Sequence, residues 1–209
     1  MIGGLYAITR ETDDSAQLLN EVEAVLKGGA AVVQYRDKSA DVARQHEQAS
    51  ELLVMCKRYK VPLIINDSLR LADLVGADGI HLGRDDGNIR EARIVLGAEK
   101  IIGVSCYQSL ELALAAQTAG ADYVAFGSFF ASVTKPDAPR ADFALLQHAS
   151  RVLHLPIVAI GGITPDNAES LIEAGADAIA IIHALFEVPI DIEARARRFA
   201  DLFIAETED

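Results

Sequence analysis

Short apolar runs alternate with longer segments of helical character along the chain. The apolar runs are rich in Val, Ile and Phe and cover residues 4–9, 28–34, 62–67, 76–82, 101–106, 120–126, 156–162 and 175–181. Runs of this length without polar alternation are typical of strands buried on both faces. The helical segments between them cover residues 15–28, 39–60, 68–75, 88–97, 109–119, 143–153, 165–174 and 191–204. The pattern therefore predicts eight strands that alternate with eight helices.

Glycine, proline and small polar residues mark the element boundaries. Four of the apolar runs open on a glycine directly after a helical segment, at Gly28, Gly76, Gly120 and Gly175. Glycine is favoured just past a helix end because it accepts the left-handed backbone conformation. We expect Ser15 and Ser39 to cap their helices, and Thr164 to cap a helix whose first residue is Pro165.

Strands that alternate with helices form a parallel sheet, because a right-handed crossover returns each strand beside the last. With eight such units, closure into a (β/α)8 TIM barrel is predicted. An open doubly wound sheet is the alternative, but it normally carries a Gly-rich phosphate turn after its first strand. The chain has "ITRETDD" there instead. No linker or low-complexity run divides the chain, so residues 1–209 are predicted to form a single catalytic domain.

Charge and composition narrow the range of partners. The chain of 209 residues has a formal net charge of −12, and 51% of its residues are apolar. Such a chain repels nucleic acid and anionic membranes, which are bound by clustered Lys and Arg. Cys56 and Cys106 form no paired motif and are predicted to be reduced, buried thiols. With no signal peptide and no bilayer-spanning apolar run visible, we expect a cytoplasmic protein. A homo-oligomer is compatible with the sequence.

Polar residues gather where the predicted strands end. In barrels of this type the active site lies at the carboxyl ends of the strands and in the loops that follow them. The second strand ends in "QYRDK", and alternation along the strand puts Gln34, Arg36 and Lys38 on one face. The third strand ends in Asn66 and Asp67. We expect these groups to rim the mouth of the barrel.

Carboxylates and cations in neighbouring loops suggest a metal. Asp85 and Asp86 follow the fourth strand, one strand along from Asp67. Magnesium prefers a few carboxylates together with water and substrate phosphate oxygens. Asp86 could equally cap the next helix or occupy a turn before Gly87. The residue types therefore suggest a Mg²⁺ site without excluding a structural role for Asp86.

The remaining strand ends offer hydroxyl, amide and imidazole groups. Ser105 ends the fifth strand. The long loop after the sixth strand carries Ser132, Thr134 and Lys135, and the seventh strand runs into Gly161-Gly162, whose unobstructed N–H groups suit a phosphate. The eighth strand ends at Ile182 and His183, and the loops after strands seven and eight are the common phosphate site of such barrels. His81 is interpreted as a hydrogen-bonded core residue, whereas His183 is compatible with either role.

The motifs "QYRDK", "IIND", "GIHLGRDD", "GVSC", "TKPDAP" and "AIGGIT" occur in this order at these positions. The sequence closely resembles the thiamin phosphate synthase family over nearly the whole chain. That family joins hydroxymethylpyrimidine diphosphate to a thiazole phosphate, giving thiamin phosphate and pyrophosphate. Two departures stand out. Ser132 replaces a threonine common in the family, and His183 stands where many members have serine.

The resemblance implies a role for each candidate residue. It implies that the pyrimidine diphosphate is held by Gln34, Arg36, Lys38, Asn66, Ser105 and Lys135. It implies that Mg²⁺ is held by Asp67 and Asp86. It implies that the thiazole phosphate site is lined by Ser132, Thr134, Gly162, Ile182 and His183. The predicted catalytic residues are Arg36, Lys38, Ser105 and Lys135.

The resemblance also implies a dissociative reaction, in which the departing pyrophosphate is neutralised and the thiazole nitrogen captures a pyrimidine carbocation. Two other classes of function stay open. A thiazole tautomerase would act on the thiazole phosphate alone, with a histidine as acid and base. A non-catalytic barrel would bind the phosphorylated ligand as a sensor. The retained cations and carboxylates argue against the tautomerase, and nothing in the sequence marks a partner surface for the sensor.

Overall fold

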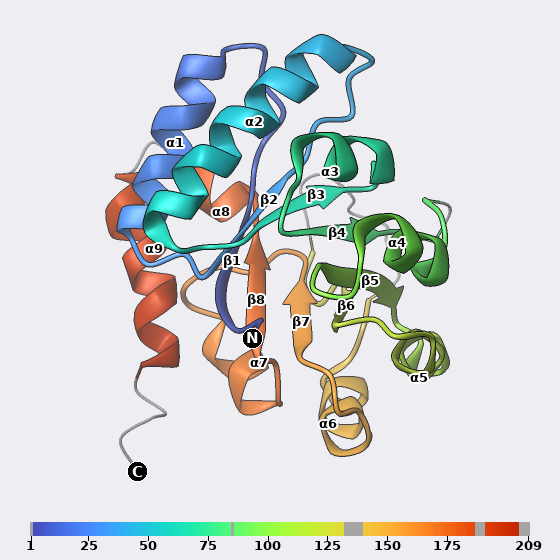
Figure 1. Ribbon diagram of the computed structural model, residues 1–209. Coiled ribbons are helices and arrows are strands. Elements are labelled where there is room, and N and C mark those ends of the chain that lie inside the picture. The colour runs from blue at the N-terminus through green and yellow to red at the C-terminus, as the bar shows by residue number, and fades with distance from the viewer. Residues whose placement is uncertain (1, 85, 132–139, 187–190, 205–209) are drawn as a thin grey trace.

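The structure is a computed structural model that describes residues 2–84, 86–131, 140–186 and 191–204. Eight parallel strands follow one another around a closed barrel, β1 pairing with β8 to complete the ring. Helices surround the barrel, and α9 lies beside α1 near the point where the ring closes (Figure 1). The strands are β1 (Gly4–Ile8), β2 (Val32–Tyr35), β3 (Leu63–Asn66), β4 (Gly79–Leu82), β5 (Ile101–Tyr107), β6 (Tyr123–Gly127), β7 (Ile157–Ile160) and β8 (Ala178–Ile181).

Each strand is followed by a helix, and the last strand is followed by two. The helices are α1 (Ser15–Lys27), α2 (Val42–Tyr59), α3 (Leu69–Val75), α4 (Ile89–Leu96), α5 (Leu110–Ala119), α6 (Phe143–Val152), α7 (Glu169–Glu173), α8 (His183–Phe186) and α9 (Ile192–Ala200), with a 3₁₀ turn η1 (Asp201–Phe203) after α9. Of the helices in the described part of the chain, none is both long and apolar enough to span a bilayer. The closed ring confirms the predicted (β/α)8 TIM barrel and rules out the open doubly wound sheet.

Two predicted helix caps were wrong, although α1 begins at residue 15 as predicted. Asp14 and Asp41 are the caps of α1 and α2, and their carboxylates accept from the backbone N–H groups of Gln17 and Arg44. The predicted cap Ser15 is instead the first residue of α1. The predicted cap Ser39 lies before the start of α2. A carboxylate next to a serine can cap as well as the hydroxyl can, so residue type alone did not decide between them.

The segment after β7 also differs from the prediction. Residues 165–167 form a turn, so α7 begins later than predicted, and the helix predicted at 165–174 is much shorter. The carbonyl of Thr164 accepts from the N–H groups of Asn167 and Ala168, and the Asn167 side chain bonds back to the Thr164 N–H. His183 is not the last residue of β8 but the first of α8.

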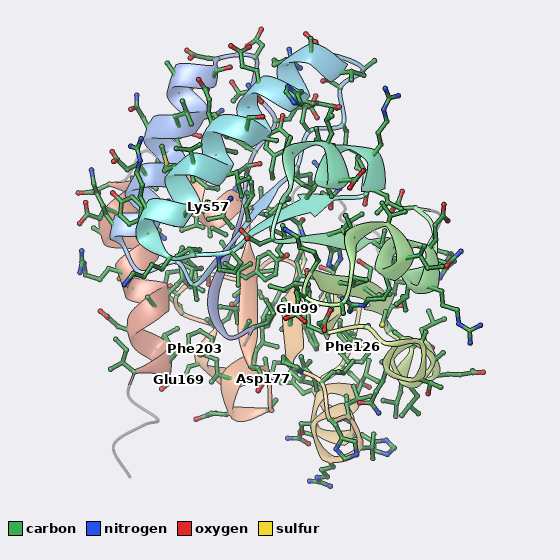
Figure 2. All side chains as sticks on the ribbon, in the orientation of Figure 1. Lys57, Glu99, Phe126, Glu169, Asp177 and Phe203 are labelled. Atoms are coloured by element: carbon green, nitrogen blue, oxygen red, sulfur yellow. The ribbon has the colours of Figure 1, made fainter. Side chains whose placement is uncertain are left out.

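The buried side chains form two layers, one inside the barrel and one between the strands and the surrounding helices. The inward-facing set packs within the ring and includes Tyr6, Val32, Ile64, Tyr123 and Val158. The outward-facing set packs between strands and helices, where side chains fill the space around the ring, as Figure 2 shows. Val32 belongs to the inward set, so Gln34, two residues further along β2, faces the interior as well. The free thiols of Cys56 and Cys106 are buried, as predicted.

Gly103 of β5 makes room inside the barrel for a large neighbour. A Cβ at this position would lie 1.9 Å from Cζ of Tyr123, whose side chain is fully buried. The tyrosine ring therefore occupies the space that any other residue at 103 would need. Close packing of this kind leaves little room for relaxation.

We predict that Gly103→Ala destabilises the protein by about 1–3 kcal/mol or more, because the added methyl forces the Tyr123 ring out of place. Urea unfolding followed by circular dichroism measures the change. Gly3→Ala is the matched control. A Cβ there would lie 3.4 Å from the Asp177 carbonyl oxygen, an ordinary contact, and its effect should stay within about 0.5 kcal/mol. Equal midpoints for the two variants would contradict this account of the interior.

Candidate active site

The loop after β2 brings Arg36 and Lys38 to the carboxyl end of the barrel. Two residues of the β1–α1 loop hold its backbone. The N–H of Arg36 donates to Thr9 Oγ1 at 2.9 Å, and the N–H of Lys38 donates to Glu11 Oε2 at 3.1 Å. Arg36 is half-buried and Lys38 is exposed. The "ITRETDD" stretch therefore supports the neighbouring loop, a role that the sequence reasoning missed.

Asp37 anchors the same loop from its other side. Its side chain is almost completely buried and lies 3.5 Å from the Arg44 guanidinium of α2. Its carboxylate also accepts from the Ser39 N–H at 2.7 Å. Since Asp37 has the opposite parity to Arg36 and Lys38, its burial against α2 leaves those two cations to face the mouth.

Asp67 and Asp86 come together with Lys38. Lys38 Nζ lies 2.5 Å from Asp67 Oδ2. The backbone of Asp67 has a φ of 62°, a left-handed conformation that aspartate tolerates better than most residues. Asp86 Oδ2 accepts from the Gly83 N–H at 3.0 Å, and its carboxyl group is within hydrogen-bond reach of Asp67. Burial and, after it, the neighbouring Asp67 carboxylate raise the pKa of Asp86.

These carboxylates have the chemistry of a hard-cation site. Two partly buried carboxylates at adjacent strand ends repel each other, and a divalent cation relieves that repulsion. Within the described residues, no cluster of three or more His, Cys, Asp and Glu side chains could hold a metal. A pair of carboxylates fits magnesium, which takes one or two carboxylates and completes its shell with water and phosphate oxygens. Asp85 lies outside the described residues.

A chain of buried polar side chains crosses the barrel interior beneath this cluster. Gln34 Nε2 donates to Tyr6 Oη at 2.9 Å, and Tyr6 Oη lies 2.7 Å from Tyr123 Oη. His81 Nδ1 lies 2.9 Å from Tyr123 Oη, and its Nε2 lies 2.8 Å from Ser105 Oγ. Burial lowers the pKa of His81 to about 4. His81 is thus the hydrogen-bonded core histidine that the sequence predicted.

Other inward positions surround this chain. Asn66 ends β3 and is paired in register with His81 on β4. The register of β5 against β6 shifts between Ser105 and Tyr107, a bulge of the kind that often re-aims side chains near active sites. Tyr6 and Tyr123 were missed from the sequence, although both share the inward parity of their strands.

The glycines after β7 pack against the start of the β6–α6 loop. Gly162 has a φ of 64°, and a Cβ there would lie 2.4 Å from the Ala131 carbonyl oxygen, so only glycine fits. The N–H of Phe130 donates to the Gly161 carbonyl at 3.0 Å. Ile182, half-buried, packs against the inward set, and His183 begins α8 after β8. The predicted residues Ser132, Thr134 and Lys135 lie outside the described residues.

The closed ring and these strand ends define a class of protein: the (β/α)8 barrel enzymes, whose active site lies at the carboxyl ends of the strands. The model of the thiamine monophosphate synthase family matches residues 5–185. The chain belongs to the thiamine monophosphate synthase family, as its motifs predicted.

Named relatives agree with this assignment. The chain is 65% identical to a thiamine-phosphate synthase of Thiobacillus denitrificans, covering 99% of this chain and 98% of the relative. It is 57% identical to a thiamine-phosphate synthase of Methylobacillus flagellatus, over 97% and 96% of the two chains. Among solved structures, the thiamine phosphate pyrophosphorylase from Pyrococcus furiosus is similar with a TM-score of 0.87 and 31% identity, over 98% and 96% of the two chains.

Proposed function

We propose that the chain is a thiamine-phosphate synthase that joins hydroxymethylpyrimidine diphosphate to a thiazole phosphate, with pyrophosphate as the leaving group. The family and the names of its relatives support this activity. The observation that carries it for this chain is the meeting of Lys38 with the Asp67 and Asp86 carboxylates at the ends of adjacent loops. A cation beside paired carboxylates suits a metal-bound diphosphate better than a single phosphate.

The pyrimidine diphosphate would lie over β2 to β5. Arg36 offers a planar fork for phosphate oxygens and Lys38 a mobile point charge. Gln34, Asn66 and Ser105, which have inward parity, would contact the pyrimidine half. Lys135, outside the described residues, belongs to the same proposed set. The thiazole phosphate would lie at Gly162, Ile182 and His183, joined by Ser132 and Thr134.

Asp67 and Asp86 are the residues proposed to hold Mg²⁺. When bound, the ion would supply positive charge to the leaving pyrophosphate. This role agrees with the small number of carboxylates, because diphosphate oxygens are then needed to complete the shell. The free protein should therefore bind the ion more weakly than the protein with the diphosphate bound.

The chain's own residues would act mainly by electrostatics and alignment. Arg36, Lys38 and Lys135 offset the charge that develops on the leaving pyrophosphate, which favours a dissociative bond cleavage. The two phosphate sites hold the thiazole nitrogen in line with the pyrimidine methylene carbon, so that capture follows cleavage without a second encounter. No general base is required by this scheme. Burial keeps His81 neutral, so it would not act as a strong acid.

A thiazole tautomerase is the nearest rival, and a non-catalytic phosphate-binding barrel is the other. The tautomerase would have no use for a cation and two carboxylates over β2 to β4. In His81, the most buried histidine at the strand ends, both ring nitrogens are already hydrogen-bonded to protein side chains. Nothing in the described structure marks a signalling surface for the sensor. The cytoplasmic location and the oligomeric state remain predictions.

The test is direct. The purified protein is incubated with both phosphorylated substrates and Mg²⁺, and thiamin phosphate and pyrophosphate are quantified by mass spectrometry. We expect equal amounts of both products, and none when either substrate is left out. Conversion of the thiazole phosphate alone would support the tautomerase. Binding of both ligands without any turnover would support the sensor.

A further inference from the structure

The buried polar chain has a fixed order of side chains, from Gln34 through Tyr6, Tyr123 and His81 to Ser105. Tyr6, Tyr123 and Gln34 are almost completely inaccessible to solvent, and His81 is 8% exposed. Each link joins two polar atoms between 2.7 and 2.9 Å apart. Buried hydroxyl protons need acceptors, and each tyrosine has only one proton to donate. Together with the orientation of the Gln34 amide, these two conditions determine which atom donates at every link.

The direction begins at Gln34. Its amide nitrogen donates to Tyr6 Oη and cannot accept, so Tyr6 is an acceptor at this link. In the described structure, the only other polar partner of Tyr6 Oη is Tyr123 Oη, so Tyr6 must donate its one proton there. Tyr123 Oη therefore accepts from Tyr6, and its own proton is left for His81 Nδ1.

The proton that Tyr123 donates also determines the tautomer of His81. Because Nδ1 accepts from Tyr123, the imidazole must be neutral and must carry its proton on Nε2. The Nε2–H then donates to Ser105 Oγ at 2.8 Å. The serine oxygen is thus an acceptor toward the protein, and its hydroxyl proton points elsewhere. Ser105 is partly exposed and lies two residues before the end of β5, where the bulge begins.

We infer that Tyr6, Tyr123 and His81 are positioning residues, which form a one-way hydrogen-bond chain and leave the proton of the Ser105 hydroxyl available to donate to the bound substrate. This inference rests on the proposed function only in naming the pyrimidine diphosphate as the group that accepts. This hydrogen-bond chain also links Gln34 to Ser105. The orientation of the Gln34 amide on β2 therefore determines whether the Ser105 hydroxyl on β5 donates or accepts. Among the described residues no donor reaches Gln34 Oε1, which leaves that oxygen for a substrate donor.

The reverse order of donors would place the proton of His81 on its other ring nitrogen. If Gln34 presented its oxygen to Tyr6, every donor would reverse and His81 would carry its proton on Nδ1. Ser105 would then donate to Nε2 and could only accept from a substrate. The tautomer of His81 therefore distinguishes the two orders without any enzyme assay.

Nitrogen-15 NMR of histidine-labelled protein reads that tautomer. We expect His81, assigned by its loss in His81→Asn, to be neutral at pH 7 with the proton on Nε2. Tyr123→Phe should shift the Nδ1 resonance toward that of a bare, unbonded nitrogen. Tyr6→Phe should leave it in place, because Tyr123 still donates to His81. A proton on Nδ1, a charged ring, or an Nδ1 resonance unmoved by Tyr123→Phe would overturn the inference.

Activity provides a second, independent readout. Tyr123→Phe should lower kcat/KM roughly tenfold, the effect of one mispositioned hydrogen bond. In a Ser105→Ala background the same change should have little further effect, because Tyr123 acts through the serine. Losses that multiply in the double variant would overturn the inference. Tyr59→Phe is the matched control, since its hydroxyl bonds Glu23 on the outer helices and its loss should leave kcat/KM unchanged.

The two readouts separate this inference from the proposed function. The predicted tautomer and its response to Tyr123→Phe in a protein without synthase activity would uphold the one-way chain and refute the function. Synthase activity with the opposite tautomer would uphold the proposed function and overturn the one-way chain. Should Tyr123→Phe fail to fold, the tautomer of the unaltered protein and the Tyr6→Phe spectrum still decide the direction.

Discussion

Asp67→Asn should slow thiamin phosphate formation by roughly 100- to 1,000-fold, the loss seen when one charge-stabilising group is removed from an active site. The substitution keeps the size of the side chain but removes a charge that lies 2.5 Å from Lys38 Nζ and within reach of Asp86. The fold should be unaffected, because the carboxylate lies at the barrel rim, outside both packed layers. Single-turnover kinetics of pyrophosphate release measure the effect.

Three comparisons sharpen this prediction. Asp86→Asn should give a similar loss, and the double variant should lose less than the product of the two, because both carboxylates would serve one ion. Raised Mg²⁺ should restore part of the rate in either single variant. Asp13→Asn, which removes an exposed charge before α1, should turn over normally. Full turnover in both single variants, or in the presence of a chelator, would refute the metal-assisted reaction and favour the tautomerase.

The barrel could be predicted because each of its strands and helices is recognisable from a short stretch of sequence. Each strand is a short apolar run and each crossover a helical segment, so alternation alone favours a parallel closed sheet. Helix boundaries were less certain for the same reason. Asp14 next to Ser15 offers two caps within one step, and only the path of the chain decides between them. The turn at residues 165–167 likewise depends on Asn167 bonding back to Thr164.

The rim residues were predictable from parity, but their supports were not. Arg36 and Lys38 follow from alternation along β2. The chain that ends at Ser105 does not, because it joins Tyr6 to Tyr123 across 117 positions of sequence. Parity shows that both rings face inward but not that they meet. That meeting depends on Gly103, whose missing side chain leaves space for the Tyr123 ring.

The separation of the two proposed phosphate sites leads to the second large effect. Arg36 follows β2, whereas Gly162 follows β7, and both β1 and β8 lie between these strands along the shorter path around the ring. A change at Arg36 should therefore reach one ligand and not the other. This holds only if the half-buried guanidinium contacts the diphosphate directly, since a general change in the electrostatic potential would weaken the binding of both ligands.

Arg36→Ala should weaken binding of the pyrimidine diphosphate by roughly 10- to 100-fold, the cost of losing hydrogen bonds to a charged group, and leave thiazole phosphate affinity within about twofold. Calorimetric titration of each ligand alone measures both values. Arg84→Ala is the matched control, because it removes the same charge from the β4–α4 loop, two strands along the ring, where the guanidinium lies 4.9 Å from the centre of the Tyr107 ring. It should change neither affinity strongly, because an exposed charge acts weakly through water. Equal losses for both ligands in Arg36→Ala, or a matching loss in Arg84→Ala, would mean that overall charge rather than a dedicated contact holds the diphosphate. The assignment of two separate phosphate sites would then be wrong.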